Sequence, residues 1–277
     1  MAKPPKKEAR AGVTEIFALL RHSFEPAQSV HFLVALVTLR WLADAKRDAR
    51  PLPCHLELPR CVEEHTPLTL EKDHLGHWFV AMFEQLENLN RPQLASLFTG
   101  LDFASPRFQG NDEHRGLLLR AVEILWFKDR YQCSFELMKE ALAISRSCLV
   151  TSFTAPEWNT PESLCELTAR LMQPKADDTV YDPACGTGQM LVHMEGALEC
   201  KRKRVRLYGA EPHQAAWALA KVSAFYYGYS PEHIAMSDAL QPENVLESED
   251  GQRKFDVVIA HPPWGANITA SDSRSRA

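Results

Sequence analysis

The sequence predicts an α/β chain with a helical first half, residues 11–150, and an open sheet in the second half, residues 151–277. Apolar residues recur at helical spacing through the first half, whereas the second half holds four short β-branched or aromatic runs. Each run ends at a polar or glycine-rich stretch, the layout of an open α/β sheet that binds its ligand at the carboxyl ends of its strands. Residues 1–10 are expected to be a flexible basic tail.

Composition and charge narrow the class of protein. With 277 residues, 45% hydrophobic and 24% charged, the chain is typical of a soluble globular protein of one large or two modest domains. Seven scattered cysteines favour reduced thiols and the cytoplasm. A net charge of -5 argues against broad coating of DNA, so contact with nucleic acid needs a local patch or a partner. The cationic run Lys201–Arg206 is either such a patch or a solvated loop.

Helices are predicted throughout the first half. The run Phe32–Leu39 is apolar almost all round, which indicates a buried helix, and it is too short to cross a bilayer. Asn111 or Asp112 is expected to cap the helix that follows it. The predicted helices span Val13–Arg21, Pro26–Lys46, Leu75–Glu87, Pro92–Phe98, Glu113–Phe127 and Phe135–Arg146.

A proline-rich stretch between two of these helices holds potential metal ligands. Cys54, His55, Cys61 and His65 offer thiol and imidazole groups, but the two cysteines are farther apart than in the usual structural zinc sites. A loop with two partly buried thiols is the favoured interpretation, and no metal is expected.

A glycine turn organises the second half. The strand-like run Asp178–Tyr181 leads into D-P-A-C-G-T-G-Q, where Gly186 and Gly188 allow a sharp turn and close approach of a ligand. Asp182 would repel a pyrophosphate but suits a cation such as a sulfonium or an α-amino group. Ala184 replaces the first glycine of the dinucleotide fingerprint, which disfavours a nicotinamide-dependent dehydrogenase.

The three later strands also end at candidate ligand-binding residues. Val205–Ala210 ends at Glu211, where a carboxylate can take both hydroxyls of a ribose. Ile234–Ser237 ends at Asp238, which is placed to accept from an adenine amino group. The fourth, Phe255–Ala260, runs into His261, Pro262, Pro263 and Trp264.

These motifs, D-P-A-C-G-T-G, G-A-E-P, S-D-A and F-D-V-V-I-A-x-P-P-W, resemble those of the N6-adenine DNA methyltransferases, specifically the modification subunits of type I restriction-modification systems. The resemblance covers residues 151–265 well and the helical half more loosely. It implies a Rossmann-like class I methyltransferase sheet, S-adenosylmethionine as cofactor, and adenine N6 in DNA as acceptor. The implied partners are DNA, a separate specificity subunit and a second modification subunit. The implied cofactor-binding residues are Thr160, Asp182, Ala184, Gly186, Gly188, Glu211 and Asp238.

Two interpretations stay open in the segments before the glycine turn. Thr160 is either the cap of a helix with Pro161 at its first position or, as the resemblance implies, a residue at the methionine end of the cofactor. The helical domain either closes around DNA and contacts other subunits, as in the family, or only covers one end of the sheet.

The resemblance places the chemistry at His261–Trp264. A polar side chain and the carbonyl of Pro262 accept the two amine hydrogens, and Trp264 stacks on the flipped base. Here the chain departs from the family, whose first position is usually Asn. Neutral imidazole accepts through one nitrogen and protonated imidazole through none.

A second departure is length, since the family's sheet continues beyond the fourth strand. Val257, Val258 and Ile259 are therefore expected on an uncovered apolar edge strand. A fragment, a truncated relative and a half-sheet completed by another chain all stay open. The alternative function is a catalytically impaired cofactor-binding or assembly module.

Overall fold

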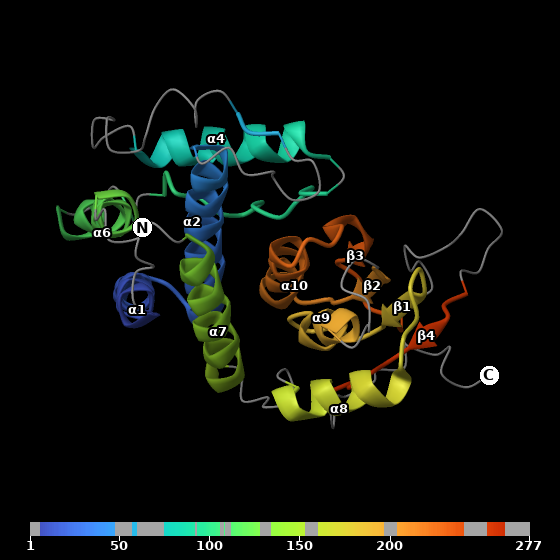
Figure 1. Cartoon of the computed structure of the whole chain (residues 1–277). Helices are drawn as coiled ribbons and strands as arrows, with labels where there is room; N and C mark the ends of the chain where they lie inside the picture. Colours follow the sequence, from blue (N-terminus) through green and yellow to red (C-terminus); the bar gives the residue numbers. More distant parts are fainter. Residues whose placement is uncertain are drawn as a thin grey trace. The chain divides into compact units, whose positions relative to one another are not determined.

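The computed structural model describes residues 6–47, 57–59, 75–91, 93–105, 108, 112–127, 134–152, 160–196, 204–240 and 254–263. The chain divides into two compact units, Met1–Leu149 and Val150–Ala277 (Figure 1). Among the described residues, no helix has the length and apolar character needed to span a bilayer.

The first unit is helical. Helix α1 begins at Lys6, inside the stretch for which a flexible tail is predicted, because Lys, Glu, Ala and Arg favour a helix. The predicted helix over 113–127 continues in its last turn as a π-helix, η4 (Glu123–Phe127). The α-helices are α1 (Lys6–Ser23), α2 (Pro26–Arg47), α4 (Leu75–Leu89), α6 (Asp112–Val122) and α7 (Ser134–Ser152).

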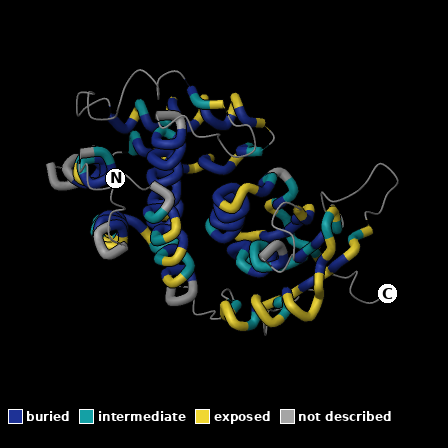
Figure 2. The backbone as a smooth tube through the Cα atoms, in the orientation of Figure 1, coloured by how far each residue is buried: buried dark blue, intermediate teal, exposed yellow. Residues whose placement is uncertain are grey.

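Helix α2 is the core of this unit, as the sequence predicts. Its residues from Ser29 to Leu42 are all buried (Figure 2). The ring centroids of Phe32 and Phe103 lie 4.8 Å apart in a cluster of phenylalanine rings. Three buried polar residues of α2 are paired: His31 Nε2 lies 2.7 Å from the Leu97 carbonyl oxygen, and Arg40 forms a 2.9 Å ion pair with Asp44. Pairing offsets the cost of burying these groups, whereas the buried hydroxyl of Thr38 has no hydrogen-bond partner among the described residues.

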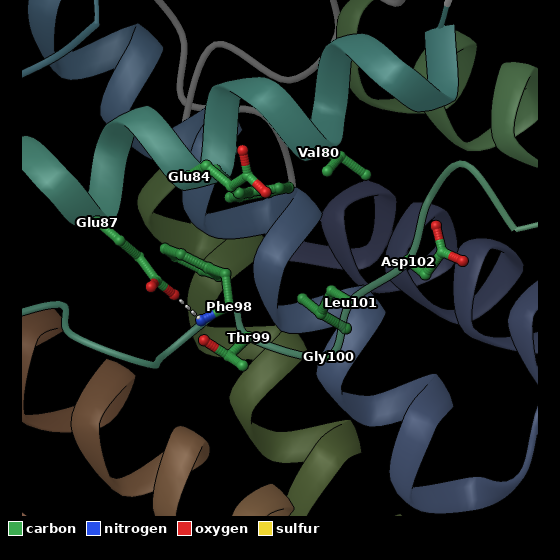
Figure 3. Close-up of a pocket in the computed structure, with 9 residues that line it drawn as sticks. Val80, Glu84, Glu87, Phe98, Thr99, Gly100, Leu101 and Asp102 are labelled. Atoms are coloured by element: carbon green, nitrogen blue, oxygen red, sulfur yellow. Dashed lines mark hydrogen bonds between the residues drawn. The ribbon is translucent and has the colours of Figure 1, made fainter.

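The predicted helix over Pro92–Phe98 is wrong, since the described residues 93–98 form turns. Ser96 has a left-handed φ of 60°. The buried carboxylate of Glu87 on α4 accepts a hydrogen bond from the backbone N–H of Phe98 (Figure 3) and another from the backbone N–H of Ser96. A distant carboxylate thus replaces the helical partners of these amides, which sequence periodicity cannot reveal.

The second unit is built on a parallel sheet. Its strands, β1 (Thr179–Asp182), β2 (Arg206–Ala210), β3 (Ile234–Ala235) and β4 (Val257–Val258), lie in the order β3-β2-β1-β4 and all pair in parallel. The helices are α8 (Glu162–Met172), α9 (Gln189–Gly196) and α10 (Gln214–Tyr226), with a 3₁₀ turn, η6 (Pro231–His233), before β3. The predicted α/β class is confirmed, and each predicted strand region overlaps an observed strand.

The strand order determines where a ligand can bind. The chain leaves β1 toward β2 on one side, whereas β4 pairs with β1 on the other side. The strand order therefore reverses between β1 and β4, and open α/β sheets bind ligands at the carboxyl ends of such strands. The backbone N–H of Ile259 donates to the Tyr181 carbonyl at 2.9 Å, which fixes the chain after β4 beside the glycine turn.

The helices of this unit pack in contact with one another against the sheet. Helix α9 contacts β1 and β2, α10 contacts α9 and β3, and α8 packs on α9 (Figure 1). Gly188 at the start of α9 has a φ of +74°, and a Cβ there would lie 3.1 Å from Ala220 on α10. Glycine is therefore needed for the close approach of the two helices.

Strand β4 is an edge strand of the sheet within the described residues. Val257 and Ile259 are buried, whereas 55% of Val258 is exposed. On α8, Leu171 is 72% exposed. Of the three residues predicted on an uncovered apolar edge, only Val258 is exposed, and the prediction is wrong for Val257 and Ile259.

Candidate functional site

A cavity of about 450 Å³ lies at the carboxyl ends of the strands in the second unit. Its walls come from the start of α8, the glycine turn after β1, and the segments that follow β2, β3 and β4. The sheet order brings these segments together, because parallel strands end at the same edge. The predicted site residues in its lining are Thr160, Asp182, Ala184, Gly186, Glu211, Asp238, His261, Pro262 and Pro263.

Among the described residues, one predicted site residue, Gly188, is not in this lining. Gly188 packs against α10, so its role in the structure is to seat α9. Trp264 lies outside the described residues, as do Cys54, His55, Cys61 and His65.

Asp182 is the most deeply buried carboxyl group of the cavity, with 2% of its surface exposed. Its Oδ1 accepts a hydrogen bond from the Ala184 N–H at 3.0 Å. Burial raises the pKa of Asp182 to about 7, the hydrogen bond opposes that rise, and the charge of Glu211 adds to it. A carboxyl group with a pKa of about 7 ionises readily when a cation enters the cavity.

Glu211 follows β2 and supports the glycine turn. Its Oε2 accepts from the Gly186 N–H at 3.1 Å, and its Oε1 accepts from the His213 N–H at 2.8 Å. Burial raises the pKa of Glu211, and the two hydrogen bonds oppose that rise. A carboxylate has about four lone-pair sites, so two remain for hydroxyl donors of a ligand.

Asp238 comes after β3 and is half-buried in the cavity wall. Its Oδ1 accepts from the Leu240 N–H at 2.9 Å, which turns the chain along the wall. The remaining oxygen can accept from a ligand amino group.

Thr160 is not the helix cap that a purely local interpretation predicts. Pro161, with φ -53° and ψ 138°, is the N-cap of α8, and its carbonyl accepts from the N–H groups of Leu164 and Cys165. The hydroxyl of Thr160 instead lies 3.2 Å from His261 Nδ1, across a sequence separation of 101 residues. The first and last segments of the cavity wall are joined by this contact.

About half of the residues in the cavity wall are not predicted from the sequence. Most of the missed residues flank a motif residue, and that adjacency is the signal that would have found them. Cys185 is buried, and burial raises the pKa of its thiol well above its usual value, so it lines the cavity as a neutral group. The missed residues are Pro183, Cys185, Thr187, Gln189, Met190, Pro212, His213, Ala239, Leu240 and Ala260.

Gly209 on β2 is a further missed residue, although it does not line the cavity. A Cβ at Gly209 would lie 2.9 Å from Cys185 Sγ. Glycine in the strand therefore leaves room for the turn that carries Gly186.

The donor set of this cavity fits S-adenosylmethionine. Its described wall contains the carboxyl groups of Asp182, Glu211 and Asp238 and neither lysine nor arginine. Such a wall repels phosphate and suits a ligand with a positive charge, vicinal hydroxyls and an amino group.

A second cavity, of about 330 Å³, lies in the helical unit (Figure 3). Glu84 and Asp102 at its edge are exposed, and the buried Glu87 carboxylate is engaged by the turn over 93–98. This engagement gives Glu87 a structural role.

The two described arginines of the cationic run form hydrogen bonds within the second unit. Arg204 donates to the Tyr227 carbonyl at 3.3 Å, and Arg206 donates to the Asp177 carbonyl at 3.2 Å. Lys201, Arg202 and Lys203 lie outside the described residues.

Comparison with known sequences gives consistent matches. The N-6 DNA methylase family matches residues 149–276. The type I restriction enzyme MjaVIII methylase subunit of Methanocaldococcus jannaschii is 23% identical over 192 residues, which are 67% of this chain and 33% of that protein. The MpnII methylase subunit of Mycoplasma pneumoniae is 30% identical over 127 residues, which are 43% of this chain and 23% of that protein. The chain thus spans about a quarter to a third of the length of these two relatives.

Two solved structures share the fold. A type I restriction-modification methyltransferase subunit from Streptococcus thermophilus superposes with a TM-score of 0.71 at 15% identity, over 97% of this chain and 66% of that one. A modification subunit of a putative type I restriction enzyme from Vibrio vulnificus gives a TM-score of 0.59 at 17% identity, over 94% and 61%. These likenesses extend to the helical half, which the family match leaves out.

Proposed function

The chain belongs to the N-6 DNA methylase family through residues 149–276, and from that premise we propose that it transfers a methyl group from S-adenosylmethionine to adenine N6 in DNA. We propose further that it acts as the modification subunit of a restriction-modification system. The observation that supports this best is the single cavity that holds both the carboxylates after β1, β2 and β3 and the His261-Pro262-Pro263 segment after β4. Cofactor-binding groups and amine-accepting groups thus share one space.

Each carboxylate has a matching role toward the cofactor. Asp182 ionises to face the positively charged end, Glu211 accepts from the ribose hydroxyls, and Asp238 accepts from the adenine amino group. Gly186 and Ala184 leave the turn open enough for the ligand to lie against the backbone. Bound there, S-adenosylmethionine would supply an electrophilic methyl group: its bond to sulfur would break as the bond to nitrogen forms, the neutral thioether would leave, and the methylated amine would release one proton to solvent.

The segment after β4 would prepare the acceptor. An adenine amine is a weak nucleophile because its lone pair is delocalised into the ring. Flipping the base out of the duplex costs roughly a few kcal/mol. His261 and the carbonyl of Pro262 would then accept the two amine hydrogens, which localises the lone pair on nitrogen. Trp264 would stack on the base, and this role stays a prediction.

The partners follow from the same proposal. The acidic cavity and the net charge of -5 leave DNA recognition to other surfaces or subunits. We expect assembly in the cytoplasm with DNA, a specificity subunit and a second modification subunit. The relatives reported above are named methylase subunits, which favours an enzyme over a module that has lost its chemistry.

Calorimetric titration of the purified chain with S-adenosylmethionine tests the cofactor half of the proposal. Saturable binding is expected, and Asp182→Ala should abolish it. Asp102→Ala, which removes an exposed carboxylate from the helical unit, is the matched control and should bind as the wild type does. A folded, monodisperse chain that does not bind would contradict the proposal.

Methylation of DNA in the presence of a specificity subunit tests the acceptor half. Removing a well-aimed acceptor costs roughly a hundredfold in rate, so His261→Ala should slow methyl transfer by about that factor while cofactor binding persists. His261→Asn should retain activity because its amide oxygen accepts a hydrogen bond. A large gain in His261→Asn would instead identify the wild-type chain as catalytically impaired.

A further inference from the structure

We propose that Thr160 fixes His261 as the tautomer that carries its proton on Nδ1, so that Nε2 is the ring atom left to accept a hydrogen from the target amine. The role of this tautomer toward the target amine rests on the proposed function, but the tautomer itself can be measured without any reaction. Thr160 is then a positioning residue rather than a residue that holds the cofactor.

The geometry that carries the inference is the contact of Thr160 Oγ1 with His261 Nδ1 at 3.2 Å. A hydroxyl can accept from Nδ1–H or donate to a bare Nδ1, and these two cases leave opposite states at Nε2. If Thr160 accepts, Nε2 carries a lone pair. If Thr160 donates, Nε2 carries a hydrogen and has nothing to offer an amine, which itself presents hydrogens.

The surroundings of Thr160 and His261 leave His261 Nε2 available to a ligand in the cavity. His261 and Thr160 both line the cavity, and Nδ1 is the ring atom engaged by protein. Within the part of the chain that the structure describes, Nε2 has no hydrogen-bond partner. Of the two tautomers, the one protonated on Nδ1 therefore satisfies Thr160 and presents an acceptor to the cavity at the same time.

The start of α8 does not depend on the Thr160 side chain. Pro161 fixes the start of α8 through its own carbonyl, so the helix does not require the Thr160 hydroxyl. The Cys165 thiol faces the Thr160 carbonyl at 3.8 Å, which a side-chain substitution leaves in place. The hydroxyl of Thr160 is therefore available to orient His261.

The direct test is NMR of the full chain with labelled histidine, in which the ¹⁵N shifts of the ring nitrogens report the tautomer and His261→Asn assigns the signal. We expect protonation on Nδ1 in the wild type and in Thr160→Ser. In Thr160→Val the signal should shift toward protonation on Nε2. Thr187→Val removes another threonine hydroxyl from the same cavity wall and should leave the tautomer unchanged. Protonation on Nε2 in the wild type, or no change in Thr160→Val, would overturn the inference.

A kinetic measurement separates this role from cofactor binding. Thr160→Val should lower kcat about tenfold with an unchanged Kd for S-adenosylmethionine, and Thr160→Ser should restore kcat. In the His261→Asn background the same substitution should have little effect on kcat, because an amide has no tautomer to fix. A raised Kd with unchanged kcat would assign Thr160 to the cofactor and contradict the inference. An inactive wild type with the expected tautomer would contradict the proposed function alone.

Discussion

Thr179 on β1 and Asp256 just before β4 are joined by reciprocal hydrogen bonds. The Thr179 N–H and hydroxyl donate to Asp256 Oδ2 at 2.8 and 2.7 Å, and the Asp256 N–H lies 3.0 Å from the Thr179 hydroxyl. The N–H and hydroxyl of Thr179 hold the pKa of the Asp256 carboxyl below its usual value. This pair sets where β4 begins and so where His261 lies.

Substituting Thr179 by Val should lower the melting temperature of the chain by a few degrees, because the hydroxyl is part of this pair. Thr179→Ser, which keeps the hydroxyl, is the control and should melt near the wild type. A carboxyl group with a lowered pKa contributes stability that is present above its unfolded pKa and lost only as the pH falls through its folded pKa. The difference between Val and wild type should therefore be the same at pH 6 and pH 8, and a difference that disappears within this range would contradict the assignment.

The contribution of Asp182 to stability should depend on pH in the opposite direction to that of Asp256, because burial raises the pKa of Asp182 to about 7. Between its unfolded value of 3.8 and 7 the folded chain holds the extra proton, so the free energy of unfolding falls as the pH rises through that window. Asp182→Asn removes this effect and should stabilise the ligand-free chain more at pH 8 than at pH 5, by up to roughly 2.6 kcal/mol. Thermal melts at the two pH values measure it, and an equal effect at both would show that Asp182 is already ionised in the folded state.

Cofactor binding should release protons near neutral pH. A cation favours the ionised form of Asp182, so about half a proton should leave that carboxyl group on binding at pH 7. The heat of binding should therefore vary with the ionisation enthalpy of the buffer, and affinity should be several-fold weaker at pH 6 than at pH 7.5. A heat of binding that does not depend on the buffer would contradict the prediction that the positive charge of the ligand ionises Asp182.

Gly209→Ala should disturb the glycine turn from the strand beside it. The added methyl group would lie 2.9 Å from Cys185 Sγ and 3.1 Å from Leu191 Cδ1, so the turn must shift. We expect lower stability, by roughly 1–3 kcal/mol, and weaker cofactor binding. Cys185→Ala removes the nearer atom, so the double variant should recover part of both losses; strictly additive losses would rule out this contact as the cause.

Glu87→Gln tests the turn over 93–98 in the helical unit. The amide keeps one acceptor oxygen, so one of the N–H groups of Ser96 and Phe98 loses its partner. Leaving a buried donor unpaired costs roughly 1–3 kcal/mol. Amide hydrogen exchange at these two residues should accelerate, while binding to the other unit's cavity stays unchanged in calorimetry.

Local patterns in the sequence determined the elements and the character of the main cavity. The apolar run of α2, the four β-branched runs and the glycine turn each depend on neighbours within about one helical turn or one strand, and a single sequence contains that information. Asp182, Glu211, Asp238 and His261 were found because each lies at the end of a predicted strand or directly after it, and parallel strands end at one edge.

The tertiary structure alone decided which side chains pair. Thr160 has the local appearance of a helix cap, yet its hydroxyl faces His261, 101 residues away. Glu87 converts a predicted helix into a turn, and Thr179 binds Asp256 at a separation of 77 residues. Hydrogen bonds of this kind have no periodicity, because they depend on where the fold brings separate segments together. The depth of Asp182 was equally invisible, because burial is a property of the packed sheet and helices rather than of residue 182 and its neighbours in the chain.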